Sequence, residues 1–213
     1  CGWTVTPAAA AVNRPHLCPS PRESARAMRL VFRILVWVLA GLSGLTLLAL
    51  LLAYYLAARS LPDYDARVDV EGVAAPIEIV RDAQAIPHVF AETDADAFFA
   101  LGWAHAEDRL WQLELHRRTA QGRLAELFGA RALPVDRTMR ALDLAGFARA
   151  AVDHQSETAL AVLEAYAAGI NARIRTVNAE ALGRGAPEFF LFGSGGLAPW
   201  TPADSLSVIK LMA

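Results

Sequence analysis

The longest apolar run of the chain lies near its N-terminus and predicts a membrane-spanning helix. Positions 34–58 carry no charged residue, and Leu, Val and Ala dominate there. A bilayer core needs roughly 20 apolar helical residues, so this run of about 25 is long enough to span it with some tilt. Trp37 near one end, and Tyr54 and Tyr55 near the other, stand where interfacial aromatic residues are common. We therefore expect residues 34–58 to be a transmembrane anchor.

The charges on either side of this run predict its orientation. Five arginines precede it, whereas Asp63 and Asp65 accompany Arg59 after it. Because the cytoplasmic flank of a span carries the excess of Lys and Arg, we expect the N-terminus in the cytoplasm. Everything after Ser60 is then periplasmic or extracellular. The arginines before the run are Arg14, Arg22, Arg26, Arg29 and Arg33.

Two other interpretations of the apolar run stay open. A cleaved signal peptide has an apolar core of about 7–15 residues and a small-x-small cleavage site. This core is longer, and Ala57-Ala58-Arg59 is a poor cleavage site. A buried core helix would have to be apolar on every face, which is unusual in a chain of this size. An uncleaved anchor fits the sequence best.

After the anchor the pattern predicts two short strands. Residues 76–81 and 86–91 alternate apolar and polar positions and include β-branched residues. Residues 82–85 between them predict a tight turn. Pro87 has no backbone N–H, so the second strand starts there or lies at a sheet edge.

Helical periodicity follows the strands. Thr93 is a candidate N-cap for a long helix that runs to about Gln121 and stops at Gly122. A short helix over 123–128, closed by Gly129, comes next. Apolar residues recur with helical spacing along the long helix, so we expect it to lie between other elements. They are Phe99, Trp103, Ala106, Leu110 and Leu113, flanked by Phe98, Leu101, Trp111 and Leu115.

Two further helices complete the pattern. The first covers about 156–177, with Ser156 as its cap, and its stripe contains Leu160, Leu163, Ala167 and Ile170. Residues 183–199 are rich in Gly and Pro and predict irregular connections. The last helix begins at Pro202, with Thr201 as its cap.

The chain therefore has four predicted segments. Met28 stands just before the apolar run, so residues 1–27 are either a disordered tail or lie upstream of the true start codon. Because the chain begins with Cys1 and ends inside a predicted helix, we expect it to be the leading part of a longer protein. The segments are a basic cytoplasmic tail (1–33), the anchor (34–58), a linker (59–75) and a mostly helical region with a small sheet (76–213).

Charge and cysteine content narrow the classes of function. The net charge is −2, with acids and bases interspersed, which gives no argument for nucleic acid, since that usually calls for a basic face. Both cysteines, Cys1 and Cys18, precede the anchor, so no disulfide or thiol chemistry is expected after it. No His, Cys and Asp cluster has ligand spacing, so we predict no metal site in this chain.

Several polar residues resemble catalytic groups by type. His105 and Arg109 are four residues apart on one predicted helix face, with Asp108 beside them. We interpret all three as a partly buried polar patch that pins the helix to neighbouring loops. His88 is interpreted as a hydrogen-bonded strand residue. The segment 193–196 lacks the G-x-S-x-G frame and the Gly-Lys-Ser/Thr ending of a phosphate loop, so it is interpreted as a flexible turn.

Six motifs resemble, in order, the N-terminal part of the penicillin acylase family, and together they cover about 76–213. Each alone is weak, but their order and spacing are specific. One departure concerns the turn, where the family usually has Gly before Ile-Pro-His and this chain has Ala85. If that turn needs a positive φ, Ala costs about 1 kcal/mol there. The motifs are Arg81-Asp82 with Ile86-Pro87-His88, residues 105–112, 121–129 and 165–172, Pro187-Glu188-Phe189, and residues 199–204.

The resemblance implies an α+β fold, with one N-terminal transmembrane helix followed by the mostly helical α-chain part of an αββα N-terminal-nucleophile hydrolase. Such precursors cut themselves into a small α chain and a large β chain. The first β-chain residue, usually Ser, attacks the amide carbonyl with its own α-amino group as base. By this resemblance no catalytic residue lies in the present chain, and Met212 falls where an apolar residue lines the acyl pocket. A role as a core residue stays equally open for Met212. The β chain is the implied partner, and Ca²⁺ is implied for the full-length family member.

Two classes of function follow. The leading hypothesis is a membrane-anchored amidohydrolase acting on small linear amides, with phenylacetyl, aliphatic and homoserine-lactone amides left open as substrates. The alternative is a non-catalytic membrane-anchored helical binding or scaffold protein that kept this region and lost catalysis. The downstream coding sequence distinguishes them, because the first hypothesis requires a small residue followed by Ser.

Overall fold

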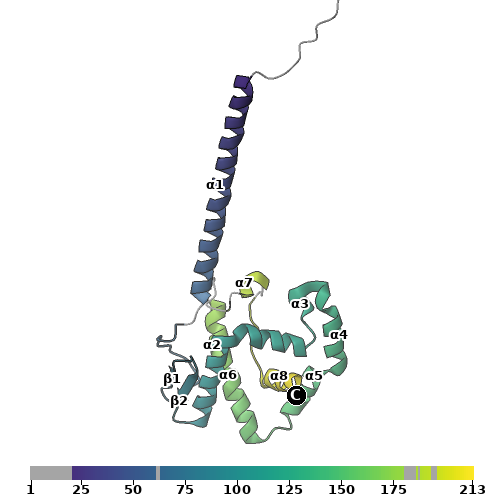
Figure 1. The fold of residues 1–213 in the computed structure, drawn as a ribbon. Coiled ribbons are helices and arrows are strands. Elements are labelled where there is room, and N and C mark those ends of the chain that lie inside the picture. Colours follow the sequence, from purple (N-terminus) through teal and green to yellow (C-terminus); the bar gives the residue numbers. More distant parts are fainter. Residues whose placement is uncertain (1–20, 61–62, 180–185, 187, 193–195) are drawn as a thin grey trace, which may run out of the picture. The chain divides into compact units, whose positions relative to one another are not determined.

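The computed structural model describes residues 21–60, 63–179, 186, 188–192 and 196–213 (Figure 1). The chain divides into two compact units, and the division falls between Leu52 and Ala53, inside the first helix. Both cysteines, Arg14 and most of the glycine-rich segment 193–196 lie outside the described residues.

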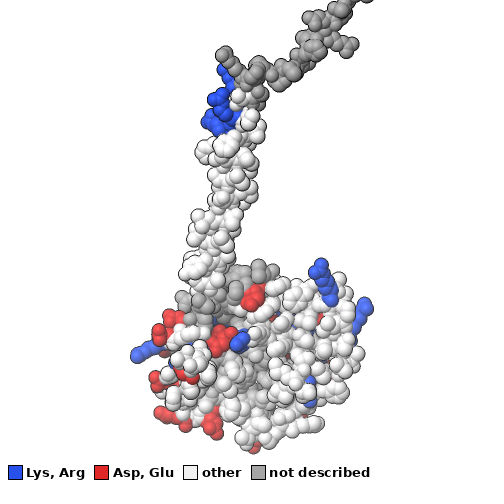
Figure 2. Space-filling model, in the orientation of Figure 1, with Lys and Arg blue, Asp and Glu red and all other residues white. Residues whose placement is uncertain are grey.

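Helix α1 runs from Pro21 to Ser60 and contains the predicted anchor. Its stretch Met28–Ala58 has a mean hydropathy of 2.4, and none of its most apolar part is buried. At 1.5 Å per residue this stretch is about 46 Å long, whereas a bilayer core is about 30 Å thick. Basic side chains gather at the N-terminal end of α1 (Figure 2). By length and composition the helix can cross a membrane, although a signal sequence has the same properties; its exposure argues against a buried core helix.

The two predicted strands form one antiparallel pair. Strand β1 is Glu78–Arg81 and strand β2 is Pro87–Phe90, with Ile79 opposite Val89. Pro87 starts the second strand, as expected. Asp82 organises the turn, because its Oδ1 accepts from the backbone N–H groups of Gln84 and Ile86, each at 2.9 Å. Ala85 has a φ of 61°, so the turn does need the left-handed conformation that Gly adopts more easily.

Two long helices form the centre of the second unit. Helix α2 is Asp94–Ala120 and helix α6 is Glu157–Ala179. Thr93 caps α2, as predicted, by accepting from the Asp96 N–H at 3.1 Å. The helices touch backbone to backbone at Gly102: a Cβ there would lie 2.1 Å from the Tyr166 carbonyl oxygen. At Gly169 a Cβ would lie 1.9 Å from the Phe99 carbonyl oxygen. Only glycine fits either position without moving a helix.

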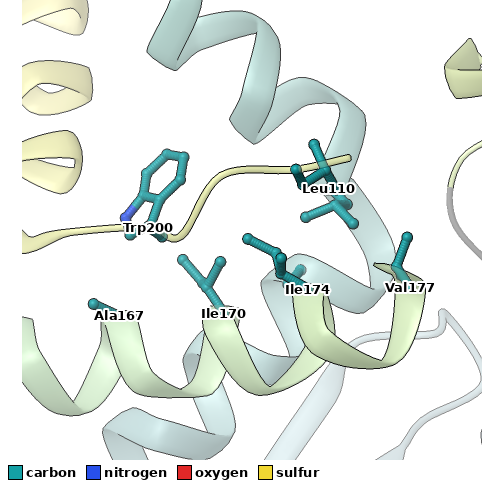
Figure 3. Packing of buried hydrophobic residues seen from close by; sticks show 8 residues of the cluster. Leu110, Ala167, Ile170, Ile174, Val177 and Trp200 are labelled. Atoms are coloured by element: carbon teal, nitrogen blue, oxygen red, sulfur yellow. The ribbon is translucent and has the colours of Figure 1, made fainter. Parts of the chain in front are cut away.

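The hydrophobic core lies along this helix pair. Figure 3 shows Leu110 of α2 facing Ile170, Ile174 and Val177 of α6, with Trp200 packed on the same cluster. A second cluster joins Phe99, Trp103 and Ala172 to partly buried residues of the linker and β1. The predicted apolar stripe of α2 is confirmed, since Phe99, Trp103, Ala106 and Leu110 are all buried.

Helix α2 is not regular throughout. Arg109 has φ −137° and ψ 25°, which breaks the helical geometry inside α2. The predicted four-residue spacing that would put His105 and Arg109 on one regular helix face is therefore interrupted at Arg109 itself. Arg109 is exposed, and His105 has one exposed side while its ring packs edge-on against Tyr166 of α6.

The segment after α2 contains helices that the sequence pattern did not predict. Helix α3 is Ala125–Phe128, shorter than expected, and a 3₁₀ turn, Gly129–Ala132, follows it. Helices α4 (Leu133–Leu142) and α5 (Leu144–Val152) come next. Helix α7 (Glu188–Phe192) lies in the stretch predicted to be irregular.

Helix α8 (Pro202–Met212) begins where predicted, with Thr201 and Asp204 forming a capping box.

Candidate functional site

One polar cluster joins the linker and β1 to the first half of α2. Arg81 donates to Asp108 at 2.9 Å and to Glu107 at 3.2 Å. Its guanidinium also lies over the Tyr64 ring, 4.0 Å from the ring centre. The Tyr64 hydroxyl donates to Asp108 at 3.2 Å. Burial raises the pKa of Glu107, and burial followed by the Asp108 charge raises the pKa of Tyr64. The cluster pins α2 to the preceding strand and linker, which is the role interpreted for Asp108.

The other candidate residues are placed separately. His105 Nδ1 lies 2.9 Å from the Tyr166 hydroxyl of α6, and burial lowers the pKa of the imidazole. Arg109 donates to the Gln112 side chain at 3.3 Å. His88 Nε2 lies 3.3 Å from the Asp82 carboxylate, so it is a hydrogen-bonded strand residue as interpreted. Within the described residues no Ser or Thr hydroxyl is hydrogen-bonded to a His or Lys side chain, as an activated nucleophile would be.

A small pocket lies beside the Arg81 cluster. Its volume is about 160 Å³, and its walls come from the linker, β1 and α2. Ligand pockets commonly start at roughly 300 Å³, so we assign no substrate to it. The lining includes Tyr64, Val70, Ile79, Arg81, Phe99, Trp103 and Glu107.

A second polar cluster surrounds the start of α8, and sequence reasoning missed it. Arg117 and Arg118 both donate to the buried carboxylate of Glu114, with Arg118 Nε at 2.5 Å. Arg117 also donates to the carbonyl oxygens of Ala198 and Pro199, at 3.1 and 3.0 Å. The spacing of Glu114, Arg117 and Arg118 is that of ion pairs within one helix, a signal that the sequence does contain. This cluster holds the segment that leads into α8.

Met212, the predicted substrate-binding residue, is the last residue of α8. Its exposed fraction is 68%, and Ile209 on the same helix is 59% exposed. The described residues surround neither side chain, so the acyl-pocket role of Met212 stays a prediction. The described residues also contain no group of three or more His, Cys, Asp or Glu that could hold a metal ion.

Comparisons with known proteins agree on one family. The sequence model of the Penicillin amidase family matches residues 76–213. Penicillin acylase 2 proenzyme of Pseudomonas sp. (strain SE83) is 38% identical over 154 residues, which are 71% of this chain and 19% of that protein. Acyl-homoserine lactone acylase QuiP of Pseudomonas aeruginosa is 41% identical over 115 residues, which are 54% of this chain and 14% of that protein.

A solved structure shows the same fold. Thermostable penicillin G acylase from Alcaligenes faecalis matches with a TM-score of 0.57 at 24% identity, over 63% of this chain and 70% of that chain. The mostly helical architecture with a small sheet is therefore that of a penicillin acylase. The chain belongs to the penicillin amidase family, as its motifs indicated, because the family model covers well over half of it. It spans about a fifth or less of the length of the curated relatives it matches.

Proposed function

We propose that this chain is the leading part of a membrane-anchored amidase that hydrolyses small linear amides. The observation that carries the proposal is the family match over residues 76–213. Relatives named as penicillin acylases and as acyl-homoserine lactone acylases support it. Their names indicate amide substrates that differ in acyl and amine parts, so the class of bond is proposed and the acyl group is left open.

The proposed chemistry belongs to the part of the protein that this chain does not cover. A Ser at the start of a large chain, freed when the precursor cuts itself, attacks the amide carbonyl. Its own α-amino group takes the proton, which suits an amine whose pKa is about 7.7–8.0. The name proenzyme, given to a relative, supports a processed precursor. The resulting large chain, in an αββα core, is the proposed partner of the present one.

The present chain contributes to the proposed substrate pocket and scaffold. Met212, at the end of α8, lines the acyl pocket together with groups from the rest of the protein. Its exposure leaves it accessible to such groups. The described residues contain no group of three or more His, Cys, Asp or Glu that could hold a metal ion. Ca²⁺ is proposed for the full-length protein. No step of the proposed reaction is assigned to it.

The proposed location follows from α1. An uncleaved α1 holds the protein in the membrane, and the arginines at its N-terminal end keep that end in the cytoplasm. The amidase part is then periplasmic or extracellular. The apolar stretch Met28–Ala58 supports the span, while the charge asymmetry supports the direction.

The experiment expresses the full-length protein and follows hydrolysis of phenylacetyl, aliphatic and homoserine-lactone amides. We expect turnover of at least one class, and loss of that turnover when the first Ser of the large chain is replaced by Ala. An intact protein that cleaves none of these amides would instead support the non-catalytic binding or scaffold alternative.

A further inference from the structure

We propose that Arg117 is a positioning residue that sets the direction of α8 and thereby the place of Met212 in the acyl pocket. The inference rests on the proposed function, because it takes the C-terminal end of α8 as part of that pocket. Arg117 itself lies on α2, and it acts through the residues that lead into α8, without contact to a substrate.

Apart from its bonds to Glu114, the Arg117 guanidinium contacts residues at the start of α8. The Arg117 side chain is 6% exposed. Its Nη1 donates to the carbonyl oxygens of Ala198 at 3.1 Å and Pro199 at 3.0 Å, and lies 3.9 Å from the Asp204 carboxylate. The guanidinium carbon is 5.3 Å from the centre of the Trp200 ring. One planar group therefore contacts both the entering segment and the first turn of the helix.

Other directional bonds hold the same turn. Gln121 donates to the Asp204 carboxylate at 3.0 Å. Asn171 of α6 pairs with the backbone of Trp200, accepting its N–H at 2.6 Å and donating to its carbonyl oxygen at 2.8 Å. The Trp200 indole N–H donates to Ser205 at 2.9 Å. The first turn of α8 is thus tied to α2 and to α6.

The remainder of α8 has no comparable restraint. Among the hydrogen bonds and ion pairs of the described residues, none joins positions 208–213 to another element. Helix α5 packs on α8, and Val208 packs on the core, but among the described residues neither contact includes a hydrogen bond or ion pair. The far end, with Ile209 and Met212, is exposed.

Because directional bonds hold only the first turn of α8, a small tilt at that turn displaces the far end of the helix. Met212 lies eight residues beyond Asp204, about 12 Å along the axis, so a tilt of about 5° moves it by about 1 Å. A displacement of about 1 Å in a substrate-positioning group can lower the rate about 100-fold. Small changes at Arg117 should therefore alter which acyl groups fit, even where the protein stays folded.

Arg118 provides a matched control on the next position of α2. It shares the Glu114 carboxylate with Arg117 and also donates to Glu126, at 2.6 Å. None of its hydrogen bonds reaches residues 198–204. Lysine at either position keeps the charge but loses the planar fork that serves several acceptors at once. The two replacements therefore differ chiefly in their effect on α8.

The experiment compares Arg117→Lys and Arg118→Lys in the full-length protein. The readout is the ratio of kcat/KM for a long-chain and a short-chain acyl amide. We expect Arg117→Lys to change this ratio about tenfold, which corresponds to about 1.4 kcal/mol, and Arg118→Lys to leave it within about twofold. Gln121→Ala removes one bond to Asp204 and the bond that Arg123 donates to Gln121. It should shift the ratio in the same direction by less, and it serves if Arg117→Lys does not fold.

A second readout separates this inference from the proposed function. Amide hydrogen exchange over residues 205–213 should be faster in Arg117→Lys than in Arg118→Lys. Equal exchange, or a uniform loss of activity toward both substrates in the two variants, would overturn the inference. A wild-type protein that cleaves no amide would count against the proposed function, and the exchange result alone would then decide whether Arg117 holds α8.

Discussion

The turn between β1 and β2 shows what single residues can reveal. Comparison of this turn with the family motif singled out Ala85, and its φ of 61° confirms that a non-glycine residue occupies a left-handed position there. The hydrogen bond between His105 and Tyr166 could not be predicted in the same way, because its partners are 61 residues apart in sequence. A motif can reveal the backbone conformation that a turn requires. The partner of a side chain on another helix depends on how the helices pack.

Replacing Ala85 with Gly should stabilise the protein. Glycine adopts the positive φ without a Cβ penalty, so we expect the free energy of unfolding to rise by up to about 1 kcal/mol. The measurement is the urea midpoint of the full-length protein. Ala83→Gly, in the same turn but without a positive φ, is the control and should give no gain. Equal shifts for the two variants would show that the φ of Ala85 is not strained.

His105 should make stability depend on pH. Burial, opposed by the Asp108 charge, lowers its pKa below the ordinary value of 6.5. A lowered folded pKa means that the folded state binds fewer protons than the unfolded state. Stability is therefore complete above about pH 6.5 and declines as the pH falls from there toward the folded pKa. Urea midpoints at pH 7.5 and 5.5, roughly one unit either side of that value, should differ less in His105→Gln than in wild type. If His105→Gln keeps the wild-type pH dependence, the imidazole of His105 is not responsible.

At the scale of elements, three of the helices were predicted from apolar spacing and caps, whereas α4 was not. Helices α2, α6 and α8 have apolar faces or caps that sequence shows directly. Helix α4 instead leaves Leu133, Val135 and Leu142 exposed. Its buried Asp136 accepts from the Leu124 and Ala125 N–H groups, both at 2.8 Å. Apolar and polar residues of α4 do recur with helical spacing, so the helix was predictable from its sequence. The contacts of Asp136 come from tertiary structure and were not.

The crossing of α2 and α6 should be highly sensitive to side-chain size. In Gly102→Ala the new methyl would lie 2.1 Å from the Tyr166 carbonyl oxygen, so the helices must separate. We expect a loss of about 1–3 kcal/mol or more, seen as faster amide exchange along both helices. Gly44→Ala, a helical glycine with nothing within 4 Å of the added Cβ, is the control. Unchanged exchange in Gly102→Ala would show that the backbones are not in contact.

At the scale of the whole molecule, the sequence motifs were sufficient to identify the family but not to predict the polar contacts at the start of α8. The family match is confirmed over 76–213, whereas the contact of Arg117 with Asp204, 87 positions further along the chain, emerged only from the structure. The described residues leave Met212 exposed, and the chain spans 19% of a relative such as the Pseudomonas penicillin acylase 2 proenzyme.

The orientation of the anchor is a prediction for the whole molecule. Moving a cationic segment across the bilayer against the potential costs about 2.3 kcal/mol per charge per 100 mV. A reporter active only outside the cytoplasm, fused after Asp65 in a bacterial host, should therefore be active. If this reporter is silent and a cytoplasmic reporter at the same position is active, the orientation is the opposite of the predicted one. Release of the fused protein from membranes would identify a cleaved signal peptide.

The most direct test of the central proposal is N-terminal sequencing of the purified full-length protein, combined with an assay of amide hydrolysis. The account predicts two associated chains, the larger beginning with Ser, and turnover that disappears when this Ser becomes Ala. A single uncut chain that hydrolyses no amide would contradict the proposal that this family member is a self-processing amidase.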